Sequence, residues 1–578
     1  MYLSSEERAI GRDNFHAAIG SPAVRRDFLK RAIKAGVAPK KGLGSFYFGY
    51  GASVSEPIRV GVIGTGDEGS VLIGAINPKY VAVQSIADIR PYNVWRAFNG
   101  DYYSAEAHKV RPGLAAIYGW DTESEARKHV KVYGAYQDLL ANAKQDGIEA
   151  VIIALPLHLH APAAIAAMKA GLHVLTEKLM GHSVRECKEM ARVAEQTRLL
   201  LAVGHQRHYN ILYDDSVDLI RRGLLGQLHH IRAQWHRGNL PGNDSWQQPM
   251  PRAAKPDDLQ ADRLDKKLGD YLGAMERAKR GDAKTRKDCE NRLAQIRAQI
   301  DDLVDAKKYG YQDRDLTDGS GKIVYRRPAV EELIRWRLWD RTGAGLMAEL
   351  GSHQLDAASI FIAAAHGGKK QHPLSVAASS ARPLFPFDRD VEDHVHCIIE
   401  FPAPGYDPKD PNNVRKRIGV QYASINGNGF GGYGETVFGT QGTLVLDLEK
   451  EAMLYRTHET SSKTKVVAAK ATGKARVPAL QVDEAGDPES AAVGELAALP
   501  ADRGYAEELE HWAWCIRNRE PENQPRCHPK VALGDAVIAL TTNLAARQGA
   551  RIEFKESWFD IHSDETPEGD KPDLTRYQ

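Results

Sequence analysis

Short apolar runs alternate with helical stretches between residues 57 and 205. The apolar runs are rich in Val, Ile, Leu and Ala, and they cover residues 58–63, 80–87, 148–155 and 172–176. Runs of this length with few charges predict strands that are buried on both faces, as in a parallel sheet. The alanine-rich stretch 161–170, which ends at Gly171, predicts a helix between two of them. The pattern therefore predicts an α/β domain built on a doubly wound sheet.

A second set of predicted strands lies in residues 206–555. Residues 228–235, 395–401 and 442–446 have the β-branched and aromatic content of strands. Residues 247–330 interrupt this domain as an insertion, and within it residues 261–308 are charged, alanine-rich and almost free of glycine. We expect a helical hairpin there. Its charges predict a solvated face, with a subunit contact as the alternative, and they include Lys266, Lys267, Arg277, Lys279 and Arg280.

The two ends of the chain lie outside these domains. Residues 1–56 precede the first strand, and we expect an N-terminal arm. Within it, Arg25-Arg26-Asp27-Phe28-Leu29-Lys30 resembles a twin-arginine export signal, although charged residues interrupt the apolar region that should follow. This segment predicts a periplasmic protein, and the alternative is a cytoplasmic protein whose arm packs on a neighbouring subunit. Polar composition predicts loop or tail at residues 466–504 and 556–578.

Charge and cysteine content narrow the function classes. The chain has 77 Lys and Arg against 76 Asp and Glu, so no overall field favours a nucleic-acid or anionic-membrane partner. The five cysteines lack a C-x-x-C pair, which argues against a disulfide framework and a zinc site. No run reaches the roughly 18 apolar residues that a membrane-spanning helix needs. We therefore expect small-molecule partners, no nucleic acid and no membrane span.

A glycine-rich motif follows the first strand directly, and it reads Gly64-Thr65-Gly66-Asp67-Glu68-Gly69. A strand that turns through glycines into a helix offers backbone N–H groups to a pyrophosphate. Asp88 ends the second strand, 19 residues after Gly69, where a carboxylate can hold ribose hydroxyls. These features predict a dinucleotide site, and a glycine-rich turn without a ligand is the alternative. Asp88 favours NAD, while Arg90 keeps NADP possible because it can compensate a 2′-phosphate.

Residues after the next strands line the same predicted crevice. Pro156 and His160 follow the strand 148–155, and Glu177 and Lys178 follow the strand 172–176. Ligands of open α/β sheets bind outside the carboxyl ends of the strands, so we expect these residues near the nicotinamide. For His158, in the same loop, we expect no chemical role.

At these residues the chain resembles the Gfo/Idh/MocA oxidoreductases, the family of glucose-fructose oxidoreductase and inositol dehydrogenase. The similarity covers most of residues 58–246 and 330–555. Besides the glycine turn, the matching motifs are Tyr136-Gln137-Asp138-Leu139-Leu140, the loop from Pro156 to His160, residues 170–178, residues 204–209, residues 223–226, residues 349–356 and residues 438–443. The resemblance implies a Rossmann domain followed by an α+β domain with a large, mostly antiparallel open sheet.

The resemblance also implies catalytic roles. Lys178 matches the lysine of the family's Glu-Lys-Pro motif, and Glu349-x-x-x-His353 matches its Asp-x-x-x-His motif. Oxidation of a secondary alcohol needs a base such as His353 and a cation such as Lys178 beside the developing alkoxide. If the segment is helical, the four-residue spacing puts Glu349 on the face of His353, where it can orient the imidazole.

Two positions depart from the family pattern. Leu179 stands where the family has proline, so the fixed φ that would aim Lys178 is absent. Glu349 replaces the family's aspartate and reaches one methylene further. A metal site at Glu349 and His353 is a rival interpretation, but no third ligand is evident, and we predict no metal.

The predicted reaction is hydride transfer from a secondary hydroxyl of a sugar, glycoside or cyclitol to NAD. Candidate substrate-binding residues are Arg207, Tyr209, Trp336 and Arg337, although the tryptophan can equally belong to a core. One alternative is a glycoside-cleaving enzyme that oxidises C3 transiently and returns the hydride. Another is a cofactor-binding sensor without catalysis. We expect a homodimer or homotetramer formed through the C-terminal sheet.

Overall fold

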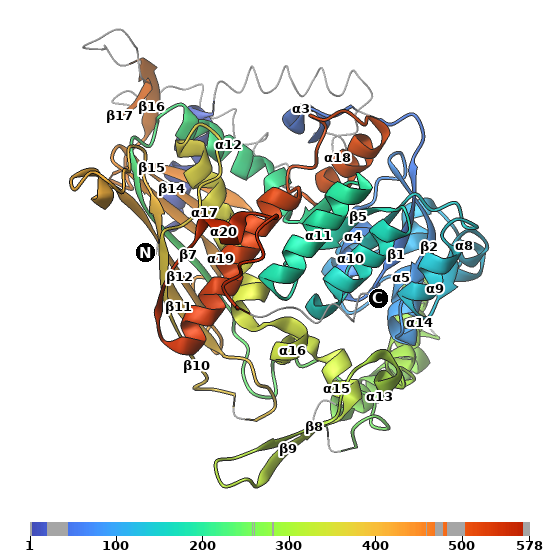
Figure 1. Cartoon of the computed structure of the whole chain (residues 1–578). Helices are drawn as coiled ribbons and strands as arrows, with labels where there is room; N and C mark the ends of the chain where they lie inside the picture. The colour runs from blue at the N-terminus through green and yellow to red at the C-terminus, as the bar shows by residue number, and fades with distance from the viewer. Residues whose placement is uncertain are drawn as a thin grey trace.

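The computed structural model describes residues 3–19, 44–51, 53–256, 258, 261–279, 282–385, 387–457, 459–468, 478–482 and 503–569. Two large sheets lie side by side, each with its own helices (Figure 1). The predicted fold class, a Rossmann domain followed by an α+β domain, is confirmed.

The N-terminal sheet is parallel, six-stranded and ordered β3-β2-β1-β4-β5-β6. Its strands are β1 (Ile58–Ile63), β2 (Val81–Ala87), β3 (Lys131–Tyr133), β4 (Ala150–Ile153), β5 (His173–Glu177) and β6 (Leu201–Gly204). Its helices are α4 (Asp67–Ala75), α5 (Pro91–Asn99), α6 (Ala105–Val110), α7 (Leu114–Tyr118), α8 (Glu123–His129), α9 (Tyr136–Asn142), α10 (His160–Lys169) and α11 (Val184–Thr197). The four predicted strands are confirmed, with ends that differ by two residues or fewer.

The register of this sheet sets the position of the dinucleotide motif. Ile63 of β1 pairs with Ala87 of β2 and with Ile153 of β4. The chain order reverses between these strands, because β2 and β4 flank β1 on opposite sides. The glycine turn, Asp88 and the loop after β4 therefore meet at one edge, which is the topological switch point where such sheets bind ligands.

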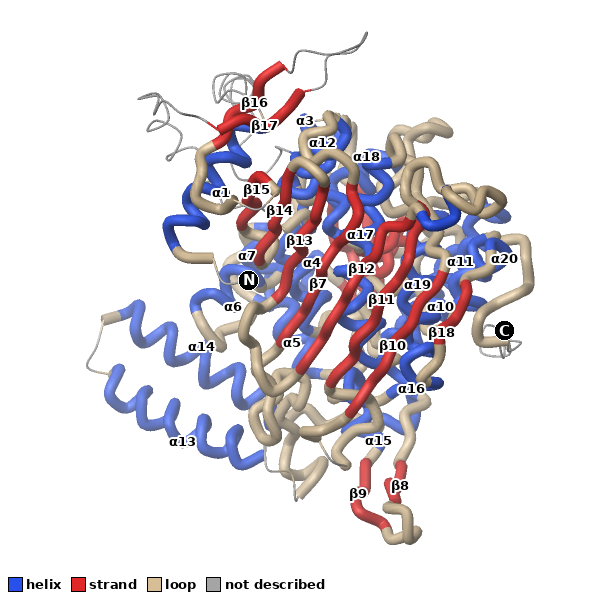
Figure 2. Tube along the Cα trace, turned by 90° about the vertical axis from the view of Figure 1, so that its left-hand side faces the viewer, coloured by secondary structure: helices blue, strands red, loops and turns tan. Residues whose placement is uncertain are grey.

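The C-terminal sheet has eight strands in the order β15-β14-β13-β7-β12-β11-β10-β18. Its strands are β7 (Leu228–His236), β10 (Ser375–Ala381), β11 (His394–Pro402), β12 (Arg417–Ile425), β13 (Tyr433–Gly439), β14 (Gly442–Asp447), β15 (Glu451–Arg456) and β18 (Arg551–Glu553). Only β7 and β12 pair in parallel within this sheet. Burial alternates along β11 and β12, as expected for a sheet with one face on a core. Helices α12 (Ile211–Arg221), α17 (Ser352–Ala365) and α19 (Pro529–Gln548) lie behind it in Figure 2.

The insertion contains the predicted helical hairpin, formed by α13 (Ala261–Ala278) and α14 (Ala283–Ile300). Helix α14 packs on α5 of the Rossmann domain (Figure 1). A short β-hairpin that the sequence pattern does not indicate follows, made of β8 (Arg314–Thr317) and β9 (Ile323–Arg327). Helices α15 (Ala329–Ile334) and α16 (Asp340–Gly343) then lead to the segment that contains Glu349 and His353.

The N-terminal arm packs on its own chain. Helix α1 (Ser5–Ala18) starts with a capping box at Ser4 and lies against β15, where Arg12 Nη1 is 2.9 Å from Glu451 Oε1. Helix α3 (Gly44–Phe48) lies against α18 (Tyr505–Arg517). The twin-arginine-like segment lies outside the described residues. No helix in the described ranges combines the length and the apolarity that crossing a membrane would need.

Part of the predicted C-terminal tail is packed, which corrects the expectation of a loop or tail from residue 556. Helix α20 (Glu556–Phe559) and the residues after it lie on the Rossmann helix α11. Lys188 Nζ of α11 donates to the carbonyl oxygens of Ser557, Ser563 and Glu565 at 2.7–2.9 Å. Buried Trp558 adds apolar contact.

In the predicted loop 466–504, β16 (Thr464–Ala468) and β17 (Pro478–Val482) form a hairpin. Residues 469–477 and 483–502 lie outside the described part.

Candidate functional site

The three glycines of the motif meet different surroundings. Gly64 has φ +85°, and a Cβ on it would lie 2.4 Å from the carbonyl oxygen of Ala154. A Cβ on Gly69 would lie 2.1 Å from the oxygen of Gly64. A Cβ on Gly66 would meet only Asn93 Nδ2, at 3.8 Å. Gly64 and Gly69 are thus required by packing, whereas Gly66 faces open space at the N-terminus of α4, as a phosphate cradle requires.

This contrast gives a prediction for two alanine variants. Gly66→Ala should fold normally and weaken NAD binding by about tenfold or more, because the new methyl group occupies space that only a ligand needs. Gly69→Ala should instead lower the thermal stability, because its methyl group collides with backbone. Isothermal titration with NAD and thermal unfolding of both variants check this. Normal NAD affinity in a folded Gly66→Ala protein would contradict the assignment of the cradle.

Asp88 lies beside the glycine turn, as predicted. Its Oδ2 accepts from the backbone N–H of Thr65 at 2.7 Å, and its Oδ1 accepts from the N–H of Arg90 at 2.9 Å. Asn93 Nδ2 donates to the same carboxylate. Burial raises the pKa of Asp88, and these donors oppose that shift. The carboxylate is fixed at the point where the second strand ends.

The neighbouring acids of the motif have different environments. Burial opposes ionisation of Asp67, but Arg96, Arg111 and Arg337 outweigh it and lower its pKa. Arg96 Nη1 lies 2.6 Å from Asp67 Oδ1. Glu68 Oε1 is buried, and no residue in the described part of the chain forms a hydrogen bond with it. Asp67 is therefore engaged by protein, and the predicted dinucleotide contacts at this turn rest on the backbone.

His160 joins the two loops that carry the next candidates. Its Nδ1 lies 2.8 Å from the oxygen of Leu179, and its Nε2 lies 2.8 Å from the oxygen of Leu155. The ring therefore connects the loop that contains Pro156 to the turn that contains Lys178. The peptide bond between Lys178 and Leu179 is cis. His160 has the contacts of a positioning residue for Lys178.

Lys178 reaches across to the second domain. Its Nζ donates to the backbone oxygen of Glu349 at 2.7 Å and lies 3.7 Å from Glu349 Oε2. Arg337 Nε donates to Glu349 Oε1 at 2.7 Å. Burial opposes ionisation of Glu349, but Arg337 and Lys178 outweigh it and lower its pKa to about 2. Glu177 precedes Lys178 in the chain. Its burial and the negative charge of the nearby Glu68 raise the pKa of Glu177 well above the usual range.

Glu349 does not orient His353, which corrects the expectation from their spacing. Residues Met347–Gly351 form a π-helical turn, and α17 starts only at Ser352. Hydrogen bonds in a π-helix run from residue i to i+5, so a four-residue spacing no longer aligns two side chains. In the part of the chain that the structure describes, the Glu349 carboxylate contacts Lys178 and Arg337 instead.

His353 lies at the start of α17 beside the aromatic side chain of Trp235. The ring centroids are 5.4 Å apart, and the ring of His205 lies at 6.2 Å. Nδ1 of His353 is buried and has no hydrogen-bond partner among the described residues. Burial, together with Lys178 and Arg207, lowers the pKa of His353 well below its usual value. The imidazole is therefore neutral at neutral pH and can accept a proton.

Two predicted substrate residues are buried behind this histidine. Arg207 Nη1 donates to the backbone oxygen of His353 at 2.6 Å, and its Nε donates to Glu449 at 2.7 Å. The hydroxyl of Tyr209 accepts from the backbone of Arg526 and contacts His511. Because both side chains are about 1% exposed, we reassign them to positioning. Trp336 and Arg337 are half-buried, with the guanidinium carbon 4.3 Å from the tryptophan centroid.

Trp235, which contacts His353, belongs to a group of aromatic and cationic side chains that the motif analysis missed. Trp235 stacks on Tyr433 at 4.4 Å, and Arg237 lies between Trp235 and Trp246 at 5.7 and 5.1 Å from their centroids. Arg503 pairs with Glu449 at 3.0 Å. Trp235 lies in a predicted strand, but the alternation of apolar and polar residues along that strand does not predict which helix its side chain contacts.

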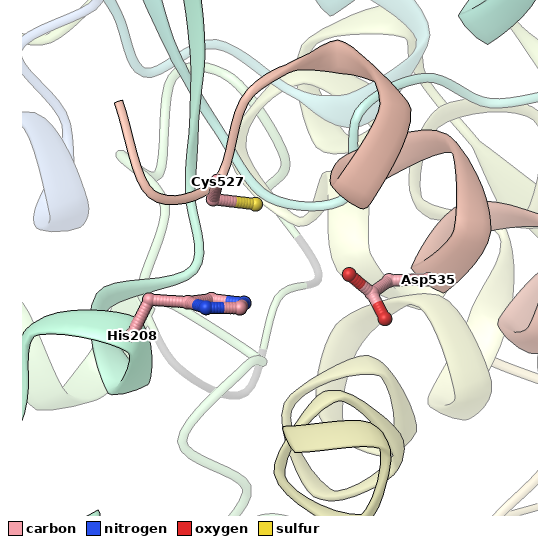
Figure 3. Close-up of side chains that lie close together, drawn as sticks. All are labelled: His208, Cys527 and Asp535. Atoms are coloured by element: carbon pink, nitrogen blue, oxygen red, sulfur yellow. The ribbon is translucent and has the colours of Figure 1, made fainter. Parts of the chain in front are cut away.

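A cluster of His208, Cys527 and Asp535 has ligand atoms within 4.8 Å of one another, and the side chains point toward a common centre in Figure 3. It is the one group with metal-ligand spacing among the described residues. Lys370 Nζ lies 2.5 Å from Asp535 Oδ1, and His208 Nε2 lies 2.9 Å from Asp356. An ammonium group already balances Asp535, so we assign this cluster as an ionic network. Glu349 and His353 do not belong to it.

Comparison with known proteins identifies the first domain. Residues 58–205 match the Gfo/Idh/MocA family, described as an oxidoreductase family with an NAD-binding Rossmann fold. A glycosyl hydrolase family 109 protein of Shewanella baltica is 28% identical over 230 residues, which is 39% of this chain and 46% of that protein. An alpha-N-acetylgalactosaminidase of Shewanella oneidensis is 28% identical over 219 residues, 38% of this chain and 43% of the relative. The match thus spans less than half of these relatives.

Two solved structures align with most of the chain at low sequence identity. The aldose-aldose oxidoreductase of Caulobacter crescentus is 16% identical, with 86% of this chain and 100% of that chain covered and a TM-score of 0.45. A levoglucosan dehydrogenase in complex with NADH and levoglucosan is 14% identical, with coverage of 86% and 100% and a TM-score of 0.48. Residues 58–205, with the glycine motif near their start, therefore form an NAD-binding Rossmann domain of the Gfo/Idh/MocA oxidoreductase family.

Proposed function

We propose that this protein is an NAD-dependent enzyme that cleaves a glycoside by transient oxidation of a sugar hydroxyl. The observation that carries the oxidation step is the position of Lys178, whose Nζ donates to the backbone oxygen of Glu349, four residues before His353. The Lys178 charge lies near enough to His353 to lower the pKa of its imidazole. The cleavage step is supported by the relatives whose names describe glycosyl hydrolases.

The residues of the first domain suit NAD. The backbone at Gly66 and the start of α4 would hold the pyrophosphate, and Asp88 would hold the ribose hydroxyls. When bound, NAD supplies a hydride acceptor that can return the hydride at the end of a cycle. The protein positions its charged side chains around the site of hydride transfer.

Proton transfer falls to the second domain. His353 takes the proton of the sugar hydroxyl, and Lys178 stabilises the negative charge that develops on the same oxygen. Oxidation at C3 acidifies the hydrogen on C2, and loss of that proton expels the aglycone from C1. Water then adds at C1, a proton returns to C2, and reduction of C3 completes a net hydrolysis. Glu349 holds Lys178 between the domains through the contact of Nζ with its backbone oxygen.

The second candidate function is net dehydrogenation of a free sugar, glycoside or cyclitol, because the first step is the same. A screen separates the two by measuring NADH absorbance and aglycone release together on chromogenic glycosides, with N-acetyl-α-galactosaminides included. Aglycone release without net NADH supports cleavage. Stoichiometric NADH with an intact glycoside would show a dehydrogenase, and neither signal would favour the cofactor-binding sensor.

We also propose export through the twin-arginine-like segment. Cells that carry Arg25→Lys and Arg26→Lys together should retain the protein in the cytoplasm, whereas the unaltered protein should appear in the periplasmic fraction. Fractionation with immunoblotting checks this, and Lys40→Arg with Lys41→Arg is a matched control. An unaltered protein that stays in the cytoplasm would favour the structural arm.

Assembly through the C-terminal sheet, whose strand β11 exposes Ile398, stays a prediction.

A further inference from the structure

The insertion between β7 and α15 reaches the end of the dinucleotide crevice that the adenosine would occupy. Tyr309 and Tyr311 follow the helical hairpin in the chain. The hydroxyl of Tyr309 is 4.0 Å from a Cβ built on Gly134, which follows β3. The ring of Tyr311 lies edge-on to His158, after β4, with centroids 5.7 Å apart. The segment therefore touches the loops that follow two different strands of the Rossmann sheet.

Tyr311 is enclosed by these contacts. It is 3% exposed and belongs to a small apolar cluster with Ala306, Ala329 and Leu333, against which Ile89 packs. Burial and the nearby Asp88 carboxylate raise the pKa of Tyr311 above its usual value. The segment thus also reaches the loop after β2, where Asp88 ends the strand. His158 packs against the insertion through this ring contact, which the sequence did not indicate.

Asp302 connects the insertion to Arg90, the residue that kept NADP possible. Asp302 is 1% exposed, and its Oδ2 accepts from Arg90 Nε at 2.9 Å and Nη2 at 2.7 Å. Its Oδ1 accepts from the backbone N–H of Tyr92 at 3.1 Å, in the first turn of α5. Both carboxylate oxygens are therefore engaged, and the guanidinium is paired with a buried charge.

The hairpin is anchored on α5 and on the residues that follow it. Gln295 of α14 accepts from the backbone N–H of Tyr102 at 2.6 Å and donates to Asp101 at 2.9 Å. Its Nε2 is also 3.1 Å from the hydroxyl of Tyr92. Gln295 is 5% exposed, so these bonds are shielded from water. The anchor fixes where Asp302 can lie.

We propose that the insertion forms the outer wall of the adenosine half of the cofactor site, and that Asp302 selects NAD over NADP by holding Arg90. A 2′-phosphate carries about two negative charges and would be repelled by Asp88. Arg90 is the side chain that would offset this repulsion. Asp302 pairs with it and adds a second carboxylate. This inference rests on the family's dinucleotide binding and not on glycoside cleavage.

The test is titration of the full-length protein, stripped of bound cofactor, with NAD and with NADP. Asp302→Asn keeps the shape of the side chain and removes its charge. We expect the affinity for NADP to rise by about tenfold or more, while that for NAD changes by less than about threefold. Arg90→Ala added to Asp302→Asn should remove the gain for NADP. Asp301→Asn, one residue away and exposed, is the matched control and should change neither affinity.

A second variant tests the wall. Tyr311→Ala should speed the dissociation of NAD by roughly tenfold in stopped-flow displacement, because the covering ring is lost. Circular dichroism confirms that each variant is folded. An unchanged ratio of NAD to NADP affinity in folded Asp302→Asn, or a gain for NADP that persists without Arg90, would overturn the proposal. Failure of glycoside cleavage leaves these binding results unaffected, and binding of neither dinucleotide would overturn the cofactor assignment itself.

Discussion

His353→Ala should lower the turnover number by about two to four powers of ten, because a positioned base contributes that much to proton transfer. The substitution leaves Arg207, Glu449 and the dinucleotide turn in place. Arg207 bonds to the backbone oxygen of His353 and not to its ring, so the local backbone should keep its position. The affinity for NAD should therefore remain within about twofold of the unmodified protein. Steady-state kinetics on the substrate from the screen, with separate titration of NAD, measures both.

The pH profile adds a second readout for this variant. Burial and neighbouring cations lower the pKa of His353 well below its usual value, so the imidazole stays neutral down to acidic pH. The acid limb of kcat/KM should then lie below pH 6.5, the ordinary value for histidine, and should disappear in His353→Ala. His366→Ala, at the far end of α17, is the control and should leave turnover and profile unchanged. Near-normal turnover of His353→Ala at saturating substrate would show that another group takes the proton.

Lys178→Met should lower the turnover number by about a hundredfold or more. Methionine keeps the length of the side chain but removes the cation that faces the developing alkoxide, and such a donor contributes about two to three powers of ten. Because Lys178 also lowers the pKa of His353, its removal should move the acid limb of kcat/KM to higher pH. Kinetics over a range of pH checks both effects. A loss of NAD affinity with unchanged kcat would contradict a role in the transition state.

Two controls accompany this variant. Lys169→Met removes an exposed lysine on α10 and should have no effect.

Glu349→Gln should lower the turnover number less than Lys178→Met does, because it keeps the side-chain volume and the backbone oxygen that holds Lys178. It leaves Lys178 and Arg337 without a neutralising carboxylate. The pKa of His353 should then fall further, so the acid limb should move to lower pH, opposite to the shift in Lys178→Met.

The sequence predicted the first domain well because each of its signals is local. A buried strand of Val and Ile, glycines at fixed spacing and an acid at the next strand end all occur within about 30 residues. The same signals located the turn, Asp88 and Lys178. The predicted helical hairpin also followed from composition over a single stretch, at residues 261–300.

The contacts between distant segments could not be predicted in this way. The side chains that Glu349 contacts depend on a π-helical turn, which the local sequence pattern did not predict. The partner of Arg90 lies in an insertion more than 200 residues away. Arg207 was expected to bind the substrate, yet Glu435 and Glu449 of the second domain pair with it and it is buried. Such long-range pairs have no signature in the local pattern.

In the proposed reaction, oxidation of the sugar is transient and the glycosidic bond is cleaved without net change in the cofactor. The most direct measurement is the reaction of the glycoside from the screen in D2O, followed by NMR and mass spectrometry of the released sugar alongside NADH absorbance. The proposal predicts aglycone release, no accumulation of NADH and one deuterium at C2 of the sugar. Accumulation of NADH with an intact glycosidic bond, or release of a sugar with no deuterium at C2, would contradict it.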